Sequence, residues 1–123
     1  MKVTILGTDY QVKVSSAAEN PKLEDANGIS ELWSHEIILN LDDMDSPNAF
    51  DNVKDFYHKV LRHEVIHCMF HEMGLSQYCQ DEVLVDALAI VFPKIQPVLN
   101  AVDCMRIEKE NEECYGKETK KNT

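Results

Sequence analysis

The uninterrupted stretch from Asp51 to Met73, which holds no proline or glycine, most constrains how this chain can fold. Ser46-Pro47 ahead of it predicts an N-cap followed by a first-turn proline, and Gly74 predicts the C-terminal stop. At helical periodicity its first half has one apolar face: Val53, Phe56, Tyr57, Val60 and Leu61. Beyond Arg62 the apolar side chains surround the helix, so we expect this part to be buried in the core.

The same segment carries the motif HExxH as His63-Glu64-Val65-Ile66-His67. Residues four apart lie on one face of a helix, so both imidazoles can reach a single Zn²⁺ ion. The glutamate between them can take a proton from a metal-bound water, which is the chemistry of metal-assisted hydrolysis. A buried carboxylate is unfavourable unless it is paired, hydrogen-bonded or close to a metal. The alternative is a surface helix with incidental His and Glu residues.

A second helix is predicted from Cys79 to Phe92, halted by Pro93. Asp86 is the only polar side chain among the residues after Glu82 in this helix, and it lies four positions from Glu82, hence on the same face. We expect this helix to be otherwise buried, so its lone carboxylate needs a partner. Metal-bound histidines supply one, because they normally donate their other ring N–H to a carboxylate or carbonyl.

The sequence therefore predicts that His63, His67 and Glu82 hold zinc, with water in the fourth position and Asp86 hydrogen-bonded to a ligand histidine. The competing ligands are His71, Cys68 and Asp81. His71 lies on a third successive turn of one helix and cannot converge with the other two on one ion. Cys68 is more often a small core residue, and Asp81 pairs at helical spacing with Val85 and not with a carboxylate.

These residues resemble the gluzincin metallopeptidases, in which HExxH is followed on a later helix by E-x-x-x-D, here Glu82-Val83-Leu84-Val85-Asp86. Over residues 1–95 the chain is similar to small single-domain HExxH proteins of phages and prophages. The similar stretches are Ile5–Tyr10, Asn27–Ile29, Arg62–His67, Gly74-Leu75, Asp81-Glu82 and Phe92–Ile95. The spacing from His67 to Glu82 is shorter than in thermolysin-like enzymes, and their C-terminal domain is missing.

The resemblance implies a minimal zincin-like metallopeptidase that hydrolyses peptide bonds of a protein or peptide substrate. It also implies the cytoplasm of a bacterial host. A second donor should assist zinc at the scissile carbonyl, and Tyr78 is one candidate beside His35 and His71. In gluzincins a sheet strand beside the cleft pairs with the extended substrate, and Glu36–Asn40 is the candidate here, with an ordinary sheet strand as the alternative.

Local patterns predict the remaining elements. Period-two alternation in Lys2–Leu6 and Tyr10–Val14 predicts a hairpin, and Gly28–Leu32 with Glu36–Leu41 predicts a second strand pair. An amphipathic helix is expected from about Pro97 to Glu113. Strands followed by helices indicate an α+β fold, with a small antiparallel sheet of three or four strands packed on the HExxH helix.

The chain of 123 residues is expected to form one domain over 1–116, followed by a charged tail at 117–123. Its net charge of −10 argues against nucleic-acid and membrane partners, and we expect a monomer or weak oligomer. No apolar run is long enough for a membrane span, and the N-terminus does not match a signal peptide. The four cysteines form no CxxC pair and are expected to be reduced thiols in the cytoplasm: Cys68, Cys79, Cys104 and Cys114.

Two functions are compatible with these patterns. The first is a zinc metallopeptidase that uses Glu64 as its base. The second is a non-catalytic zinc module with a zincin fold, such as a phage regulator or inhibitor, in which the metal only stabilises the fold. Structural zinc sites usually have four protein ligands, whereas three ligands leave an open position, so the pattern favours the enzyme.

Overall fold

The computed structural model describes residues 1–45 and 53–105, and the chain divides after Ile90 into two units that we describe separately. The elements are β1 (Lys2–Ile5), β2 (Thr8–Ser15), the 3-10 helix η1 (Pro21–Leu23), β3 (Gly28–Glu31), β4 (Glu36–Asn40), α1 (Asp42–Asp45), α2 (Val53–Glu72), α3 (Ser76–Cys79) and α4 (Glu82–Ala101). The predicted Ser46-Pro47 cap, the helix beyond residue 105, Cys114 and the tail at 117–123 lie outside the described residues. The single domain over 1–116 therefore stays a prediction.

The α+β class is confirmed, but the predicted antiparallel sheet is wrong, because the four strands form a mixed sheet in the order β1-β2-β4-β3. Both predicted hairpin pairs exist and are antiparallel. The first turns at Leu6-Gly7, where both residues have positive φ, as in the two-residue turns that fit the twist of a hairpin. The pairing between the hairpins is parallel, with Gln11 of β2 opposite Glu36 of β4.

The long connection after β2 explains this parallel pairing. After β2 the connection leads to the edge of the sheet, where β3 forms, and leaves one strand position open between β2 and β3. The chain then reverses, and β4 fills that position. Leu23 of η1 is fully buried, and the side-chain amide of Asn40 donates to the carbonyls of Leu23 (3.1 Å) and Ala26 (2.9 Å). These contacts fix the connection against the end of β4.

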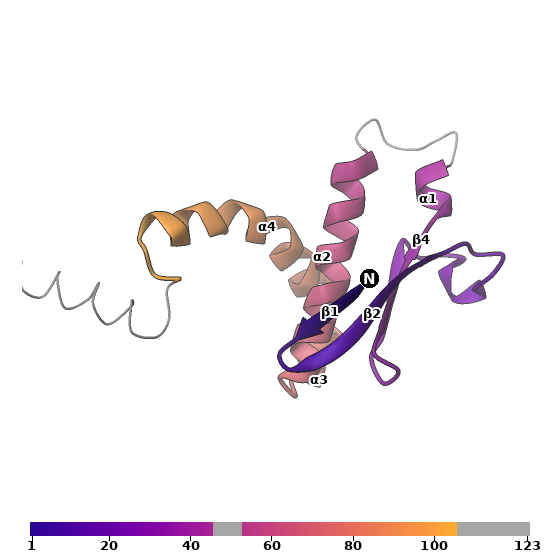
Figure 1. Cartoon of the computed structure of the whole chain (residues 1–123), viewed down its shortest axis with the longest axis horizontal. Helices are drawn as coiled ribbons and strands as arrows, with labels where there is room; N and C mark the ends of the chain where they lie inside the picture. Colours follow the sequence, from indigo (N-terminus) through magenta and orange to yellow (C-terminus); the bar gives the residue numbers. More distant parts are fainter. Residues whose placement is uncertain (46–52, 106–123) are drawn as a thin grey trace, which may run out of the picture. The chain divides into compact units, whose positions relative to one another are not determined.

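Helix α2 is packed on two sides (Figure 1). One side contacts the sheet through a cluster of buried residues that includes Tyr10, Ile37, Leu39, Val60 and Cys68. The other side joins a second cluster: Ile66, Phe70, Cys79, Val85 and Ala89. The predicted burial of the helix beyond Arg62 is therefore confirmed.

The predicted stop of α2 at Gly74 is also confirmed. Gly74 has φ +74°, a left-handed conformation that glycine adopts without a Cβ penalty. Its N–H donates to the carbonyl of His71 (3.0 Å), and the N–H of Leu75 donates to that of Phe70 (2.9 Å). This is the Schellman arrangement, which pairs carbonyls that the end of a helix leaves free.

The predicted boundaries of the later helices are wrong. Helix α4 begins at Glu82, where the Asp81 side chain caps it by accepting from the N–H of Leu84 (3.0 Å). It continues through Pro93 to Ala101, so no separate helix begins at Pro97, and residues 102–105 are not helical.

A side chain of α2 explains why Pro93 does not end the helix. Proline has no N–H, so the carbonyl of Ala89, four residues earlier, loses its helical partner. Arg62 supplies the missing donor, because its Nε lies 2.7 Å from that carbonyl oxygen.

The expectation that Val83–Phe92 is a buried segment is also wrong. Val85 and Ala89 are fully buried, but Val83 is 82% exposed and Ile90 is 43% exposed. Within the described ranges, no helix is long and apolar enough to cross a membrane.

Candidate metal centre

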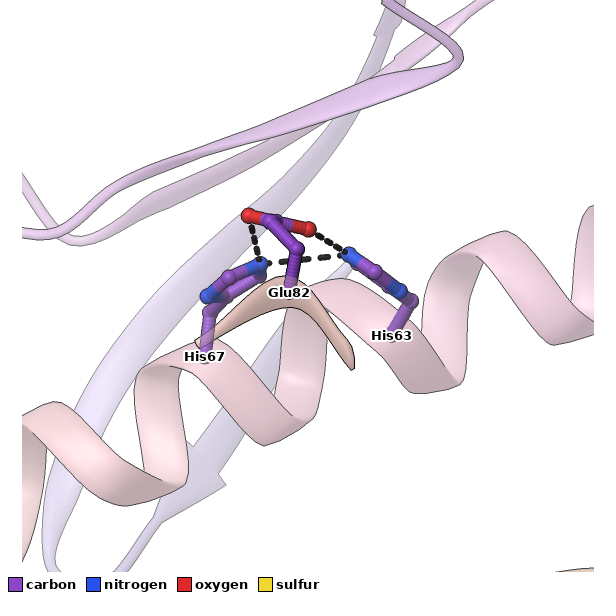
Figure 2. A group of neighbouring side chains, drawn as sticks. All are labelled: His63, His67 and Glu82. Carbon is purple, nitrogen blue, oxygen red and sulfur yellow. Dashed lines mark hydrogen bonds and ion pairs between the residues drawn. The ribbon is translucent and has the colours of Figure 1, made fainter. Parts of the chain in front are cut away.

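Three predicted ligands converge at one point between α2 and α4 (Figure 2). The Nε2 atoms of His63 and His67 are 3.2 Å apart. The Glu82 carboxylate bridges them, with Oε2 at 2.9 Å from His63 Nε2 and Oε1 at 3.1 Å from His67 Nε2. We call these three residues the triad. One donor atom from each lies within 4.8 Å of the others, so the triad could hold a metal ion.

The other ring nitrogens show which way the imidazoles present their lone pairs. His67 Nδ1 lies 2.6 Å from the carbonyl oxygen of Cys79, which can only accept, so Nδ1 carries the proton. His63 Nδ1 lies 3.3 Å from Oδ1 of Asp86. In neutral rings with Nδ1 protonated, both Nε2 atoms direct lone pairs toward the centre of the triad, where the Glu82 carboxylate also presents its oxygens. Such converging lone pairs repel unless a cation lies between them, which fits a metal site.

Asp86 lies where the sequence predicted it, beside His63, but its side chain is 41% exposed and has a second partner. The Lys59 ammonium is 3.0 Å from its Oδ1 and, by donating to it, lowers the pKa of this carboxyl below its ordinary value. Lys59 precedes His63 by one helical turn, so the i, i+4 spacing could have revealed it. The sequence analysis does not assign Lys59 to the site.

Glu64 is buried, with 6% of its surface exposed, and lies against β3. The Ser30 hydroxyl is 2.8 Å from Glu64 Oε1, within donating distance, and 3.0 Å from the backbone carbonyl of the same residue. Burial raises the pKa of Glu64 above its usual value, while the hydrogen bond from Ser30 and the nearby imidazoles act in the opposite direction. Nothing in the local sequence of β3 marks Ser30, which sequence reasoning missed.

Gly28 allows β3 to approach α2 this closely. A Cβ atom at this position would lie 3.0 Å from Val60 Cγ1, 3.2 Å from Leu39 Cδ2 and 3.3 Å from Glu64 Cγ. Any larger residue would force these three side chains to shift. A glycine inside a strand often marks such a close approach, so the signal was present in the sequence.

Glu64 and the triad open into a common hollow of about 350 Å³, which we call the β3-side hollow. The β3 end contributes Ala26, Asn27 and Gly28 to its lining. Helix α2 contributes Lys59 and Val60, together with Phe56. The hollow therefore places a buried carboxylate, a candidate metal centre and a strand edge around one space.

Two of the alternative ligands, Cys68 and Asp81, have other roles in the structure. Cys68 is fully buried in the core, and burial raises the pKa of its thiol to about 12, which disfavours the thiolate that binds metals. The Asp81 carboxylate caps α4.

The residues suggested as second donors to the scissile carbonyl do not line the β3-side hollow. Tyr78 is 45% exposed, with its ring 6.2 Å from that of Phe70. His71 stacks edge-on with Trp33, and His35 contacts Tyr10. Their role at a scissile carbonyl stays a prediction.

The prediction that Glu36–Asn40, strand β4, pairs with an extended substrate is wrong. Strand β4 lies in the interior of the sheet, paired with β2 on one side and β3 on the other, so its backbone has no free edge. The edge strand is β3, which also carries the contacts with Glu64.

Comparisons with protein families, with curated proteins and with solved structures found no match to this chain. The resemblance to gluzincins therefore stays a prediction, and the functional argument depends on the geometry of the site.

Proposed function

We propose that this chain is a zinc-dependent peptidase that uses Glu64 as its general base. The observation that carries the proposal is the placement of Glu64, buried and held by Ser30, in the same hollow as the His63–His67–Glu82 triad. A carboxylate that served only the fold would not need to share a hollow with three convergent metal-binding groups.

Zinc suits the donor set of the triad. Two imidazole nitrogens and one carboxylate oxygen are the ligands of open catalytic zinc sites. Ligand atoms at roughly 2.0–2.1 Å from a tetrahedral ion stand roughly 3.3 Å apart. The two Nε2 atoms are 3.2 Å apart, close to this value. When bound, zinc would polarise a peptide carbonyl and lower the pKa of a water.

The protein's own groups supply the proton transfer. Glu64 takes a proton from the attacking water and passes it to the leaving amine. Its raised pKa makes the carboxylate a stronger base, because base strength rises as the pKa approaches the working pH. Ser30 holds one oxygen of the carboxylate, which fixes the direction of the other. Asp86 orients His63 through Nδ1.

The free edge of β3 supports a polypeptide as the substrate. The N–H of Asn40 donates to the carbonyl of Asn27, and antiparallel pairs alternate, so Gly28 and Ser30 direct their own backbone N–H and C=O groups away from β4. An extended peptide could add to this edge as a further strand and pass over the β3-side hollow.

Substitution Glu64→Gln tests the proposal, because it removes the base and keeps the size of the side chain. Zinc-loaded wild type should cleave peptides of a proteome-derived library, and Glu64→Gln should lose about 10²–10⁴-fold in rate while retaining zinc and the fold. Mass spectrometry of the library gives the rates, and metal analysis gives the zinc content. Glu24→Gln, an exposed glutamate outside the hollow, is the matched control. Equal cleavage by wild type and Glu64→Gln would refute the proposal.

Removing the metal separates this function from a non-catalytic zinc module. The two apolar clusters hold α2 to the sheet and to α4 without help from the triad, so the chelated protein should stay folded and melt cooperatively. Its free energy of unfolding should fall by about 4 kcal/mol relative to protein with zinc a thousandfold above its Kd. Circular dichroism with thermal melting checks this, and an unfolded apo protein would favour a structural zinc.

A further inference from the structure

Helix α4 presents three different surfaces side by side around its first turns. Val85 and Ala89 are fully buried against α2. Glu82 and Asp86 form the next edge, which faces the ligand histidines. Beyond that edge, at helical spacing, lie Val83, Ala87 and Ile90, which we call the α4 strip. The edge that faces the metal site thus separates a buried apolar face from an exposed one.

The α4 strip is unusually exposed for its chemistry. The side chain of Val83 is 82% exposed and that of Ile90 is 43% exposed. The strip lines a second, shallow and widely open hollow, the α4-side hollow, which is also lined by His63, Glu82 and Asp86. An occupant of this hollow would therefore touch both apolar side chains and residues of the metal centre.

The two hollows share His63, Glu82 and Asp86 and differ in everything else. The β3-side hollow adds the charged residues Lys59 and Glu64 beside several apolar ones, whereas the α4-side hollow adds only apolar residues. The metal centre lies where they meet. A substrate chain that leaves the β3-side hollow across the centre would enter the α4-side hollow.

We propose that the α4 strip is a subsite for an apolar side chain of the substrate, on the side of the scissile bond away from β3. This inference rests on the proposed peptidase function. The strip supports a side chain as the occupant because it offers only three apolar residues on one helix face, whereas a subunit interface buries about 800 Å² per partner. Burial of such a side chain against the strip removes apolar surface of both partners from water.

A binding experiment tests the strip without requiring cleavage. The probes are acetohydroxamate and 4-methylpentanohydroxamate, which share one metal-binding group and differ by an apolar tail. Zinc-loaded wild type should bind the longer probe about tenfold more tightly in isothermal titration calorimetry. The preference should fall to about twofold or less in Val83→Ser and in Ile90→Ser, with zinc content unchanged. Val14→Ser, an exposed valine on β2 that lines neither hollow, should keep the full preference.

Cleavage of the peptide library by the same proteins gives the second readout. Wild type should enrich apolar residues at one fixed position beside the cleaved bond. The two strip variants should lose this enrichment and keep those at other positions, and Val14→Ser should match wild type. Cleavage without apolar enrichment, or with enrichment that survives both strip substitutions, overturns the subsite and leaves the peptidase function standing.

The remaining outcomes separate the two proposals. If wild type cleaves nothing, yet the strip variants abolish the hydroxamate preference, the peptidase function fails and the strip stands as a ligand-binding surface. If the hydroxamate preference is the same in all proteins, the strip does not bind an apolar group beside the metal. A wild-type dimer that Val83→Ser converts to a monomer in light scattering, with unchanged hydroxamate affinity, assigns the strip to a second copy and overturns the subsite.

Discussion

Helices α2 and α4 are each 20 residues long, but their burial does not follow their hydrophobicity. Helix α2 carries many polar and charged residues and buries Val60, Glu64, Ile66, Cys68 and Phe70. The part of helix α4 that belongs to the first unit, residues 82–90, is far more apolar, yet it buries only Val85 and Ala89. The difference comes from the neighbours, because α2 has apolar partners on two sides. The apolar character of a helix therefore shows what it can bury, and its surroundings decide what it does bury.

The three residues of the candidate metal centre differ in exposure in the same way. The two histidines of α2 are 18% and 12% exposed, and each is held through its second ring nitrogen. The glutamate of α4 is 68% exposed. In the proposed zinc site, helix α2 would therefore supply the two buried ligands and α4 the exposed one, whose side chain contacts the two histidines.

The largest expected effect is on zinc affinity. His67→Ala should weaken binding most, because a fixed ligand loses little freedom when the metal binds and contributes most of its interaction energy. Glu82→Ala should weaken it less, since part of its interaction offsets the ordering of an exposed side chain. Asp86→Ala should weaken it by about 10–100-fold, as expected for a partner of a ligand histidine. Competition with a chromophoric chelator measures all three. A larger loss in Glu82→Ala than in His67→Ala would reverse the assigned division between the helices.

An effect of intermediate size, on the free energy of unfolding, is expected at the hydrogen bond between Arg62 of α2 and Ala89 of α4. Arg62→Met keeps an apolar stem but leaves the carbonyl of Ala89 without its donor, and should lower the free energy of unfolding by about 1–3 kcal/mol. In a Pro93→Ala background the helix supplies its own N–H to that carbonyl, so the same substitution should have a smaller effect. Denaturant unfolding of the four proteins gives the coupling. Equal losses in both backgrounds would show that Arg62 does not replace the hydrogen bond that Pro93 removes.

The smallest expected effect depends on pH and concerns the end of α2. The hydroxyls of Thr8 and Tyr10 donate to Glu72, and these hydrogen bonds lower its pKa. A carboxylate with a lowered pKa stabilises the fold above its ordinary pKa, and this contribution is lost as the pH falls through the lowered value. Tyr10→Phe should therefore be less stable than wild type at pH 7. The gap should narrow as the pH falls below the ordinary carboxyl range. Thermal melts across this range test the sign, and a gap that widens toward acid would contradict it.

The features that the sequence predicted correctly depend on residues close together along the chain. The two hairpins, the stop of α2 at Gly74 and the placement of His63, Glu64 and His67 on one helix each follow from a pattern within a few residues. The convergence of Glu82 on the histidines joins residues that lie further apart in the sequence. It was predictable because an acidic pair one turn apart, in an apolar segment, indicates a metal and its hydrogen-bonded histidine.

Only the tertiary structure decided the features that depend on which segments become neighbours. These are the parallel pairing of β2 with β4, the position of β3 at the sheet edge, and the hydrogen bond from Ser30 to Glu64. They also include the passage of α4 through Pro93 and the exposure of Val83. The physical reason is the same for each. Local patterns determine which way a side chain points relative to its own helix or strand, whereas burial and pairing depend on partners that distant parts of the chain supply.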